Sequence, residues 1–570
     1  MDMGTMTSMP MGLSTNRPTQ TSSSLMTATT DYTPGTIDSQ GRYVPTAAER
    51  TAYQAARIPW AKQASFAVCC SSSPSYDTFG NFEFDMDPLL RPPSTPKVLL
   101  FSRMLSYPQV PETYEKVLSW VWTFGALGPN LVLFAGLLFA TGFTFINEYY
   151  YYPPFYGSAP LYLRSEWIAM ATLPLIFVLG SKRNIISVLT GVSHEKLQVL
   201  HQGAAFNFTY MSIVHTVASC IRAIRERGLA GTMAVNGIYV SGFVALAPLL
   251  VLFTGALPPF RRGFYESFYW VHIIMAVFFL GAMFWHGYRE LDSDAYMIAT
   301  IVLFLSSVTW RLVMVILNNP TLHLAKAEIV DEDGTLKLTI PTMFIDWHAG
   351  QHVFIRFVGV RPFDSHPFSL ATTPSPPSAK HDYNRGSIRE MVCLLKPVGG
   401  FTMALSDKVK CGANSFKVLV DGPYGGVEDG ELRKFDRVLI CVAGTGVTWG
   451  LSVLQDLVWY GEAGQEVTFV WVFRKTTSIK WFERELDSIR LAYPYVDIRI
   501  HITGATTSDI DAAGVNLTPT EGSDVSSSAN KESELINLSN FHTQSTRPDM
   551  PHLIEKEVAI AAGSLAVASE

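Results

Sequence analysis

The sequence predicts a multidomain membrane protein in which a six-helix transmembrane domain precedes a β-rich segment and then a parallel α/β segment. Apolar residues make up 48% of the 570 residues and charged residues only 16%, whereas soluble domains carry roughly a quarter charged residues. Six long apolar segments lie between residues 118 and 317. After Pro320 the pattern changes to short alternating stretches, and later to alternating strands and helices.

The composition also excludes several classes of protein. The formal net charge of −6 is modest, and it predicts no nucleic-acid partner. The six cysteines show no C-x-x-C spacing, which argues against a zinc site and against a disulfide framework. Residues 1–115 begin with a stretch rich in Met, Ser, Thr and Pro that lacks a signal sequence. We expect them to form a low-complexity, largely disordered tail.

Residues 116–320 are expected to form the transmembrane domain. About 20 apolar residues are needed to cross ~30 Å of hydrocarbon as a helix. The second segment is short and must extend into its flanks, for example into Ile185–Leu189. The six segments are Leu118–Ile146, Trp167–Gly180, Ala204–Ile221, Ile238–Leu257, Phe268–Trp285 and Tyr296–Leu317.

The region after the last span alternates between two patterns. Stretches such as Leu336–Ile340 and His352–Phe357 are typical of strands. From Val438 onward a βαβαβ series follows, which is the unit of a parallel nucleotide-binding sheet. Its expected elements are the strand Val438–Val442, a helix over about 449–460, the strand Val467–Phe473, a helix over about 481–493, and the strand Val496–Ile502. Residues 505–546 lack periodicity and predict a disordered insert.

Topology follows from the position of that sheet. An even number of spans places both termini on one side, and a nucleotide-binding segment after the last span requires that side to be the cytosol. Lysines and arginines divide five to five between the inner and outer loops, so the charge bias does not decide the orientation.

Four histidines lie in the membrane segments, in two pairs. His201 and His215 occupy the third segment, and His272 and His286 the fifth. Fourteen helical steps come within about 40° of whole turns and span roughly 21 Å, so the two histidines of a pair share a face near opposite ends of the helix. Two facing helices of this kind offer two stacked bis-histidine sites for heme iron. The alternative is that intramembrane histidines contact neighbours or line a proton path. We interpret His194, seven residues before His201, as a surface residue.

Several motifs resemble those of the fungal ferric-chelate reductases, relatives of the NADPH oxidases. Leu189–His201 resembles the approach to their first heme helix, and Trp347–Phe357 resembles the barrel strand before their flavin motif. His366–Thr372 matches that flavin motif, and Gly399–Thr402 resembles the loop that meets the FAD phosphates, where glycines admit close backbone contact. The FAD-binding residues that the resemblance implies are His366, Pro367, Phe368, Ser369, Leu370, Gly399, Gly400 and Thr402.

The nicotinamide nucleotide motifs follow in the expected order. Asp421–Gly425 resembles the loop beside the nicotinamide, and Ala443–Thr448 joins a strand to a helix as a pyrophosphate-binding turn does. Arg474 resembles the arginine that meets the 2′-phosphate of NADPH, although an ordinary surface arginine is the alternative. The implied NADPH-binding residues are Gly422, Pro423, Tyr424, Gly425, Gly444, Thr445, Gly446, Val447, Thr448 and Arg474.

The resemblance thus implies an FAD-binding β-barrel over 321–430 and a ferredoxin-reductase-like NADPH-binding α/β domain over 431–570. Electrons would pass from cytosolic NADPH through FAD and two b-type hemes, at an inner site (His201, His272) and an outer site (His215, His286), to a ferric or cupric chelate. No side chain is expected to act as a general acid or base. The expected setting is the plasma membrane, with the vacuolar membrane as an alternative, and an iron permease or oxidase is a candidate functional partner.

Two other functions stay open on the sequence alone. A superoxide-generating NADPH oxidase would use the same sequence of cofactors, with O2 as the electron acceptor. A catalytically silent heme-binding membrane protein is the second alternative, because relatives continue past the strand matching Gly563–Ala568 into a Cys-Gly-Pro loop that this sequence lacks. We expect a truncated gene model to account for that difference, and poor NADPH-driven activity for the 570-residue chain.

Overall fold

The computed structural model describes residues 126–146, 150–151, 159–288, 290, 293–374, 389–427, 430–461, 464–504, 542–544, 547–561 and 564–569, with 36–37, 43–49, 51, 119 and 122. The expected tail therefore lies largely outside the described residues, apart from a short antiparallel pair of β1 (Thr36–Ile37) with β2 (Tyr43–Val44). Most of the expected insert is also outside them. Its residues 542–544 form the edge strand β12 (His542–Gln544).

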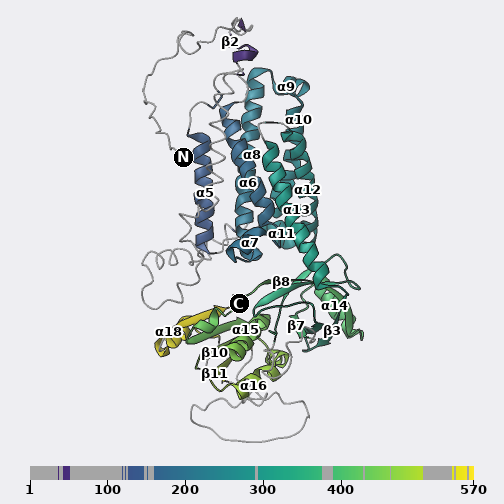
Figure 1. Ribbon diagram of the computed structural model, residues 1–570, viewed down its shortest axis with the longest axis vertical. Coiled ribbons are helices and arrows are strands. Elements are labelled where there is room, and N and C mark those ends of the chain that lie inside the picture. The colour runs from purple at the N-terminus through teal and green to yellow at the C-terminus, as the bar shows by residue number, and fades with distance from the viewer. Residues whose placement is uncertain are drawn as a thin grey trace, which may run out of the picture.

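Among the described residues, six helices are long and apolar enough to cross a membrane, as predicted. They form the upright bundle in Figure 1. Three shorter helices, α7 (Ile185–Thr190), α9 (Leu229–Val235) and α11 (Pro258–Gly263), join them. The six are α5 (Leu127–Phe145), α6 (Pro160–Leu179), α8 (His194–Glu226), α10 (Gly237–Ala256), α12 (Tyr265–Gly287) and α13 (Ser293–Asn318).

The second span extends in the direction opposite to the one expected. It begins at Pro160 and ends at Leu179, whereas Ile185–Thr190 is a separate helix. Asn184 starts that separate helix because its side chain accepts a hydrogen bond from the Ser187 amide. The expectation was wrong because Arg164 lowers the hydropathy of the first turns of α6, although its side chain is fully buried and its Nε donates to the Pro160 carbonyl.

Six antiparallel strands follow the bundle in the order β6-β5-β8-β3-β4-β7. A bridge between Leu370 and Cys393 joins the two ends of this sheet, so that it closes into a barrel. Alternate residues of β4 and β5 point into an apolar interior, as the period-two pattern predicts. The elements are β3 (His323–Ile329), β4 (Leu336–Thr342), β5 (Gln351–Phe357), β6 (His366–Ser369), β7 (Arg389–Leu395), the helix α14 (Gly400–Lys410) and β8 (Ser415–Gly425).

The last part of the chain is a five-stranded parallel sheet in the order β12-β11-β10-β9-β13. The βαβαβ prediction is confirmed, and the core of this part is built from β9, β10, β11 and α15. Figure 1 shows α13 leading out of the bundle into the barrel, with β8 at the end of the bundle. The elements are β9 (Arg437–Ala443), α15 (Val447–Tyr460), β10 (Glu466–Phe473), α16 (Glu483–Ala492), β11 (Val496–Ile502), α18 (Met550–Ile560) and β13 (Leu565–Ser569).

A buried carboxylate ties α18 to this sheet. The side chain of Glu557 is fully buried between two arginines, with Arg437 of β9 at 2.8 Å and Arg499 of β11 at 2.9 Å. The hydroxyl of Thr468 on β10 also donates to Glu557, at 3.3 Å. One residue of α18 thus reaches three neighbouring strands. Removing one partner of such a buried ionic group leaves the remaining charges without compensation.

We therefore expect Glu557→Ala to lower the free energy of unfolding of the α/β domain by about 3–5 kcal/mol. Glu555→Ala is the matched control, because Glu555 is an exposed glutamate of the same helix. Pulse proteolysis of the whole chain in a urea series, with cleavage between residues 437 and 569 identified by mass spectrometry, measures the shift. Equal urea midpoints for the two variants would show that the ion pairs of Glu557 with Arg437 and Arg499 contribute nothing to the stability of this domain.

Candidate functional site

The four membrane histidines meet in two pairs between α8 and α12. The ring centroids of His201 and His272 are 6.4 Å apart, and those of His215 and His286 are 6.2 Å apart. Two metal–imidazole bonds of about 2 Å each, together with the half-widths of the two rings, bring two centroids to roughly this separation. Each pair is therefore spaced for one metal ion between its rings.

Hydrogen bonds fix how three of these rings are oriented. The Nδ1 atoms of His201, His215 and His286 lie 2.9–3.1 Å from backbone carbonyl oxygens of α6 and α10. A carbonyl can only accept, so Nδ1 carries the proton in these three rings and Nε2 keeps its lone pair. Metal-ligating histidines are usually held in this way. His272 differs, since its buried Nδ1 has no hydrogen-bond partner among the residues described.

The structure leaves room for a large group beside the outer pair, His215 and His286. A cavity of about 690 Å³ is lined by both His215 and His286. A Cβ at Gly242 would lie 3.0 Å from the His286 ring, and one at Gly180 would lie 3.2 Å from the His201 ring. Within the described part of the chain, no group of three or more His, Cys, Asp or Glu side chains could hold a bare metal ion. The pairs therefore suit heme iron, whose other ligands come from the porphyrin.

An aromatic pair that the sequence reasoning missed lies between the two histidine pairs. Phe208 of α8 and Phe279 of α12 meet edge to face at 5.7 Å. Each lies seven residues from both histidines of its own helix, so it shares their face and sits midway along the axis. The seven-residue spacing from both histidines was the feature of the sequence that could have identified this aromatic pair. The two histidine pairs are thus separated by two aromatic rings in edge-to-face contact.

The expected flavin motif forms β6, at the edge of the barrel. His366–Ser369 pairs antiparallel with β5, placing Ser369 opposite His352 and His366 opposite Ile355. The His366 ring stacks on Phe401 at 4.8 Å and 14°. Burial lowers the pKa of His366, so the ring is neutral near pH 7.

The glycine loop expected to meet the flavin phosphates begins α14. The first residue of this 11-residue helix is Gly400, whose φ of 52° favours glycine. The Thr402 hydroxyl donates to the Gly399 carbonyl at 3.0 Å. Backbone N–H groups at the start of a helix are suited to phosphate. Phe401, which stacks on His366, belongs to the same first turn, so the structure brings the two halves of the expected flavin site together.

The expected nucleotide turn lies at the carboxyl end of β9. Gly444, with a φ of 53°, begins a short 3-10 turn that leads into α15, and Trp471 Nε1 donates to the Gly444 carbonyl at 3.1 Å. A Cβ at Gly450 would lie 2.6 Å from Val442, which explains the close approach of α15 to the sheet. Arg474 follows β10 at the same edge and is exposed. This is the edge at which parallel sheets bind nucleotides.

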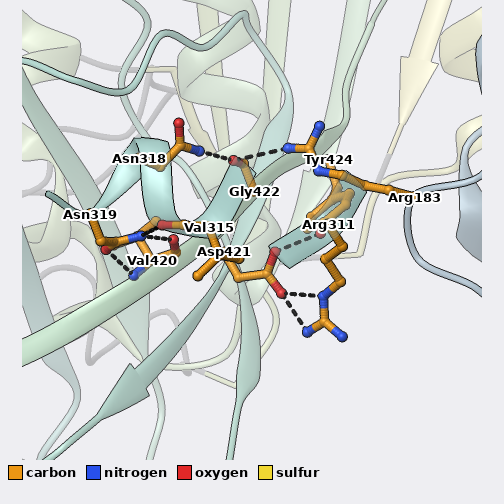
Figure 2. A network of polar contacts seen from close by, with 9 residues as sticks. All are labelled: Arg183, Arg311, Val315, Asn318, Asn319, Val420, Asp421, Gly422 and Tyr424. Carbon is orange, nitrogen blue, oxygen red and sulfur yellow. Dashed lines mark hydrogen bonds and ion pairs between the residues drawn. The ribbon is translucent and has the colours of Figure 1, made fainter. Parts of the chain in front are cut away.

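The segment Asp421–Gly425 lies elsewhere than the nucleotide turn, at the junction between the bundle and the barrel. Asp421 pairs with Arg311 of α13 at 2.5 Å, and the Tyr424 hydroxyl donates to Asp421 at 2.6 Å (Figure 2). Burial and the charge of Asp421 raise the pKa of Tyr424, so its hydroxyl stays protonated. The predicted role of Gly422–Gly425 toward nicotinamide stays a prediction.

The interpretation of His194 as a surface residue was wrong. His194 is 8% exposed at the start of α8, and its ring centroid lies 5.3 Å from that of Tyr424. Glu195 beside it contacts His352 of β5 at 2.9 Å. Nearby, Lys182 Nζ lies 3.0 Å from the centroid of the Phe354 ring. Burial, reinforced by Arg311, lowers the pKa of Lys182 to about 7.

Comparison with known proteins agrees with this arrangement. Residues 165–283 match a ferric reductase like transmembrane component, residues 320–428 an FAD-binding domain, and residues 435–569 a ferric reductase NAD binding domain. The ferric/cupric reductase transmembrane component 7 of Saccharomyces cerevisiae is 30% identical over 448 residues, covering 74% of this chain and 69% of the yeast protein. The chain belongs to the ferric reductase family.

A probable cell surface ferric reductase of Aspergillus oryzae is 32% identical over 403 residues, covering 66% of this chain and 52% of that protein. The chain therefore spans about half the length of this family member. Among solved structures, the FAD/NAD-binding domain of a Vibrio cholerae nitric oxide dioxygenase is 15% identical, with a TM-score of 0.26 over 44% of this chain and 99% of that chain.

We expect His366→Ala to weaken flavin retention because it removes the stack on Phe401. An aromatic pair contributes about 0.5–1.5 kcal/mol, or up to roughly tenfold in affinity. Bound flavin per chain after gel filtration measures the loss. His348→Ala, which changes an exposed histidine of the same barrel, should retain its flavin. Equal flavin content in the two variants would show that β6 is not part of the flavin site.

Proposed function

We propose that this chain carries electrons from cytosolic NADPH, through FAD and two b-type hemes, to a ferric or cupric chelate on the other side of the membrane. The observation that carries the proposal is the stacking of two histidine pairs about an aromatic pair, along helices that can cross a bilayer. Bound FAD accepts two electrons together and passes them on singly, which suits one-electron heme iron.

The residues of the chain have three tasks in this function. His201 with His272, and His215 with His286, would hold the two irons, and the carbonyl contacts of His201, His215 and His286 leave their Nε2 atoms free for this role. Phe208 and Phe279 exclude water between the two sites and keep them apart. At the cytosolic end, His366 and the first turn of α14 hold FAD, while the turn at Gly444 holds the nucleotide. The names of the yeast and Aspergillus relatives support the metal-chelate substrate and a cell-surface location.

The test is transport of electrons across a sealed membrane. Purified chain in proteoliposomes, with NADPH on the side of the barrel and a ferric chelate enclosed, should produce two ferrous ions for each NADPH oxidised. A ferrous-specific dye inside the vesicles measures the product. Superoxide in place of ferrous iron would identify the chain as an oxidase, and the absence of both products would exclude electron transfer.

The same preparation tests the histidine pairs. Pyridine hemochrome analysis should give two hemes per chain, and one after His201→Ala or His215→Ala, with ferrous production abolished in both. His194→Ala is the matched control, because this histidine lies on the same face of α8 and outside both pairs. It should keep both hemes. One heme in the unmodified chain would reject the two-site arrangement.

Arg474 should determine the preference for NADPH over NADH. Loss of a charge-assisted contact to the 2′-phosphate costs about 1.5–3 kcal/mol, or roughly ten- to a hundredfold in affinity. Arg474→Ala should therefore raise the KM for NADPH and leave that for NADH unchanged. Arg484→Ala removes another exposed arginine of the same domain and serves as the control. An unchanged ratio of the two KM values would make Arg474 an ordinary surface residue.

A further inference from the structure

The junction between the bundle and the barrel is built around one buried carboxylate. Asp421 on β8 is 3% exposed. Its Oδ2 accepts from both Nε and Nη2 of Arg311, at 2.9 and 2.5 Å, and its Oδ1 accepts from Tyr424. Both oxygens are thus engaged, one of them by the last membrane helix. A carboxylate held in this way fixes direction as well as distance.

Two asparagines at the end of α13 extend the same contact to the backbone of β8. Asn319 donates to the Val420 carbonyl at 2.7 Å and accepts from the Val420 amide at 2.8 Å, as a neighbouring strand would. Asn318 donates to the Gly422 carbonyl at 2.7 Å, and Arg183 donates to the same oxygen at 3.2 Å. Figure 2 shows these groups converging on three consecutive residues of β8.

One residue of this junction, Tyr424, connects the expected flavin motif with the helix of the inner histidine pair. In the barrel register, Tyr424 of β8 is opposite His352 of β5, which is opposite Ser369 of the flavin motif. On the other side Tyr424 contacts His194. His194 lies seven residues before His201 on the same face of α8, roughly 10 Å along the axis. A tilt of β8 would therefore change the distance between the flavin motif and the inner site.

We propose that Arg311, Asp421, Tyr424, Asn318 and Asn319 form a clasp that positions the flavin barrel against the inner histidine pair and so sets the rate of flavin-to-heme electron transfer. The proposal rests on the electron path proposed above. These are positioning residues, because they act through the placement of the barrel.

The experiment separates the two halves of the electron path in the purified holoprotein. Stopped-flow absorbance measures NADPH-driven heme reduction, and reduction of a soluble one-electron dye by NADPH measures electron arrival at the flavin. Asp421→Asn and Tyr424→Phe should each slow heme reduction, by about tenfold or more for Asp421→Asn, since misplacement by about 1 Å can cost a hundredfold. Arg311→Met removes the same ion pair from the helix side and leaves the sequence of Asp421–Gly425 unaltered. This variant should also slow heme reduction, while its dye reduction, flavin content and heme content stay unchanged.

The matched control is Arg389→Met, which breaks a 2.7 Å ion pair with Asp346 on the surface of the same barrel. It should leave both rates unchanged. Hydrogen exchange supplies a readout that is independent of turnover, because the Val420 amide should exchange faster in Asn319→Ala than in the unmodified chain. This measurement also keeps the proposal testable if Asp421→Asn fails to fold.

Three results would overturn the clasp. Unchanged heme reduction in Asp421→Asn and Tyr424→Phe would show that the contacts do not position the barrel. A fall in dye reduction in Arg311→Met, parallel to its fall in heme reduction, would show that these contacts act on hydride transfer instead. Slow exchange at Val420 in Asn319→Ala would show that β8 is held by other groups. Failure of the proposed function looks different, because the unmodified chain would then show no NADPH-driven heme reduction.

Discussion

The transmembrane domain depends on two pairs of imidazole rings. In each pair, one ring comes from α8 and one from α12, and their centroids are held slightly more than 6 Å apart. The rings must meet across a gap between α8 and α12, so other helices have to set their directions. Carbonyl groups of α6 orient the two histidines of α8, and a carbonyl of α10 orients His286. Glycines at the contacts of α6 with His201 and of α10 with His286 allow these helices to approach. Four of the six spans are thus committed to the two pairs.

The junction with the barrel obeys a different constraint. Burying the Arg311–Asp421 pair costs solvation, and the attraction between the charges offsets that cost only when the remaining hydrogen-bonding positions are filled. Tyr424 fills the second oxygen of Asp421. A pair of this kind contributes little net stability compared with an apolar contact, but removing one member is strongly unfavourable. The effect of the Arg311–Asp421 pair is therefore to orient the barrel relative to the bundle, because an apolar contact would not define that orientation.

Much of this architecture could be predicted from the sequence because it follows from the local periodicity of helices and strands. The 14-residue histidine spacing and the βαβαβ pattern depend only on helical and strand repeats, and the structure contains both. What failed depends on contacts between distant segments. His194 was taken for a surface residue because its partner, Tyr424, is 230 positions later in the chain. Likewise, the sequence pattern did not reveal that α6 begins before Arg164, because hydropathy cannot show that an arginine will be buried.

The two junctions of the barrel differ in chemistry. Toward the bundle, the contacts are buried and charge-assisted. Toward the α/β domain, the amides of Gly350 and Thr373 donate to Ser452 and Gln455 of α15, at 2.9 and 3.1 Å. Two ion pairs also cross this junction, the partly buried pair of Lys337 with Glu485 at 2.7 Å and the solvent-exposed pair of Lys475 with Asp333, which contributes little. Because α15 begins at the nucleotide turn, the junction with the α/β domain is the one that the nicotinamide would cross to reach the flavin in the proposed electron path. In the proposed path, the buried carboxylate Asp421 therefore lies on the side where electrons leave the flavin, whereas hydrogen bonds from α15 and more exposed carboxylates lie on the side where NADPH binds.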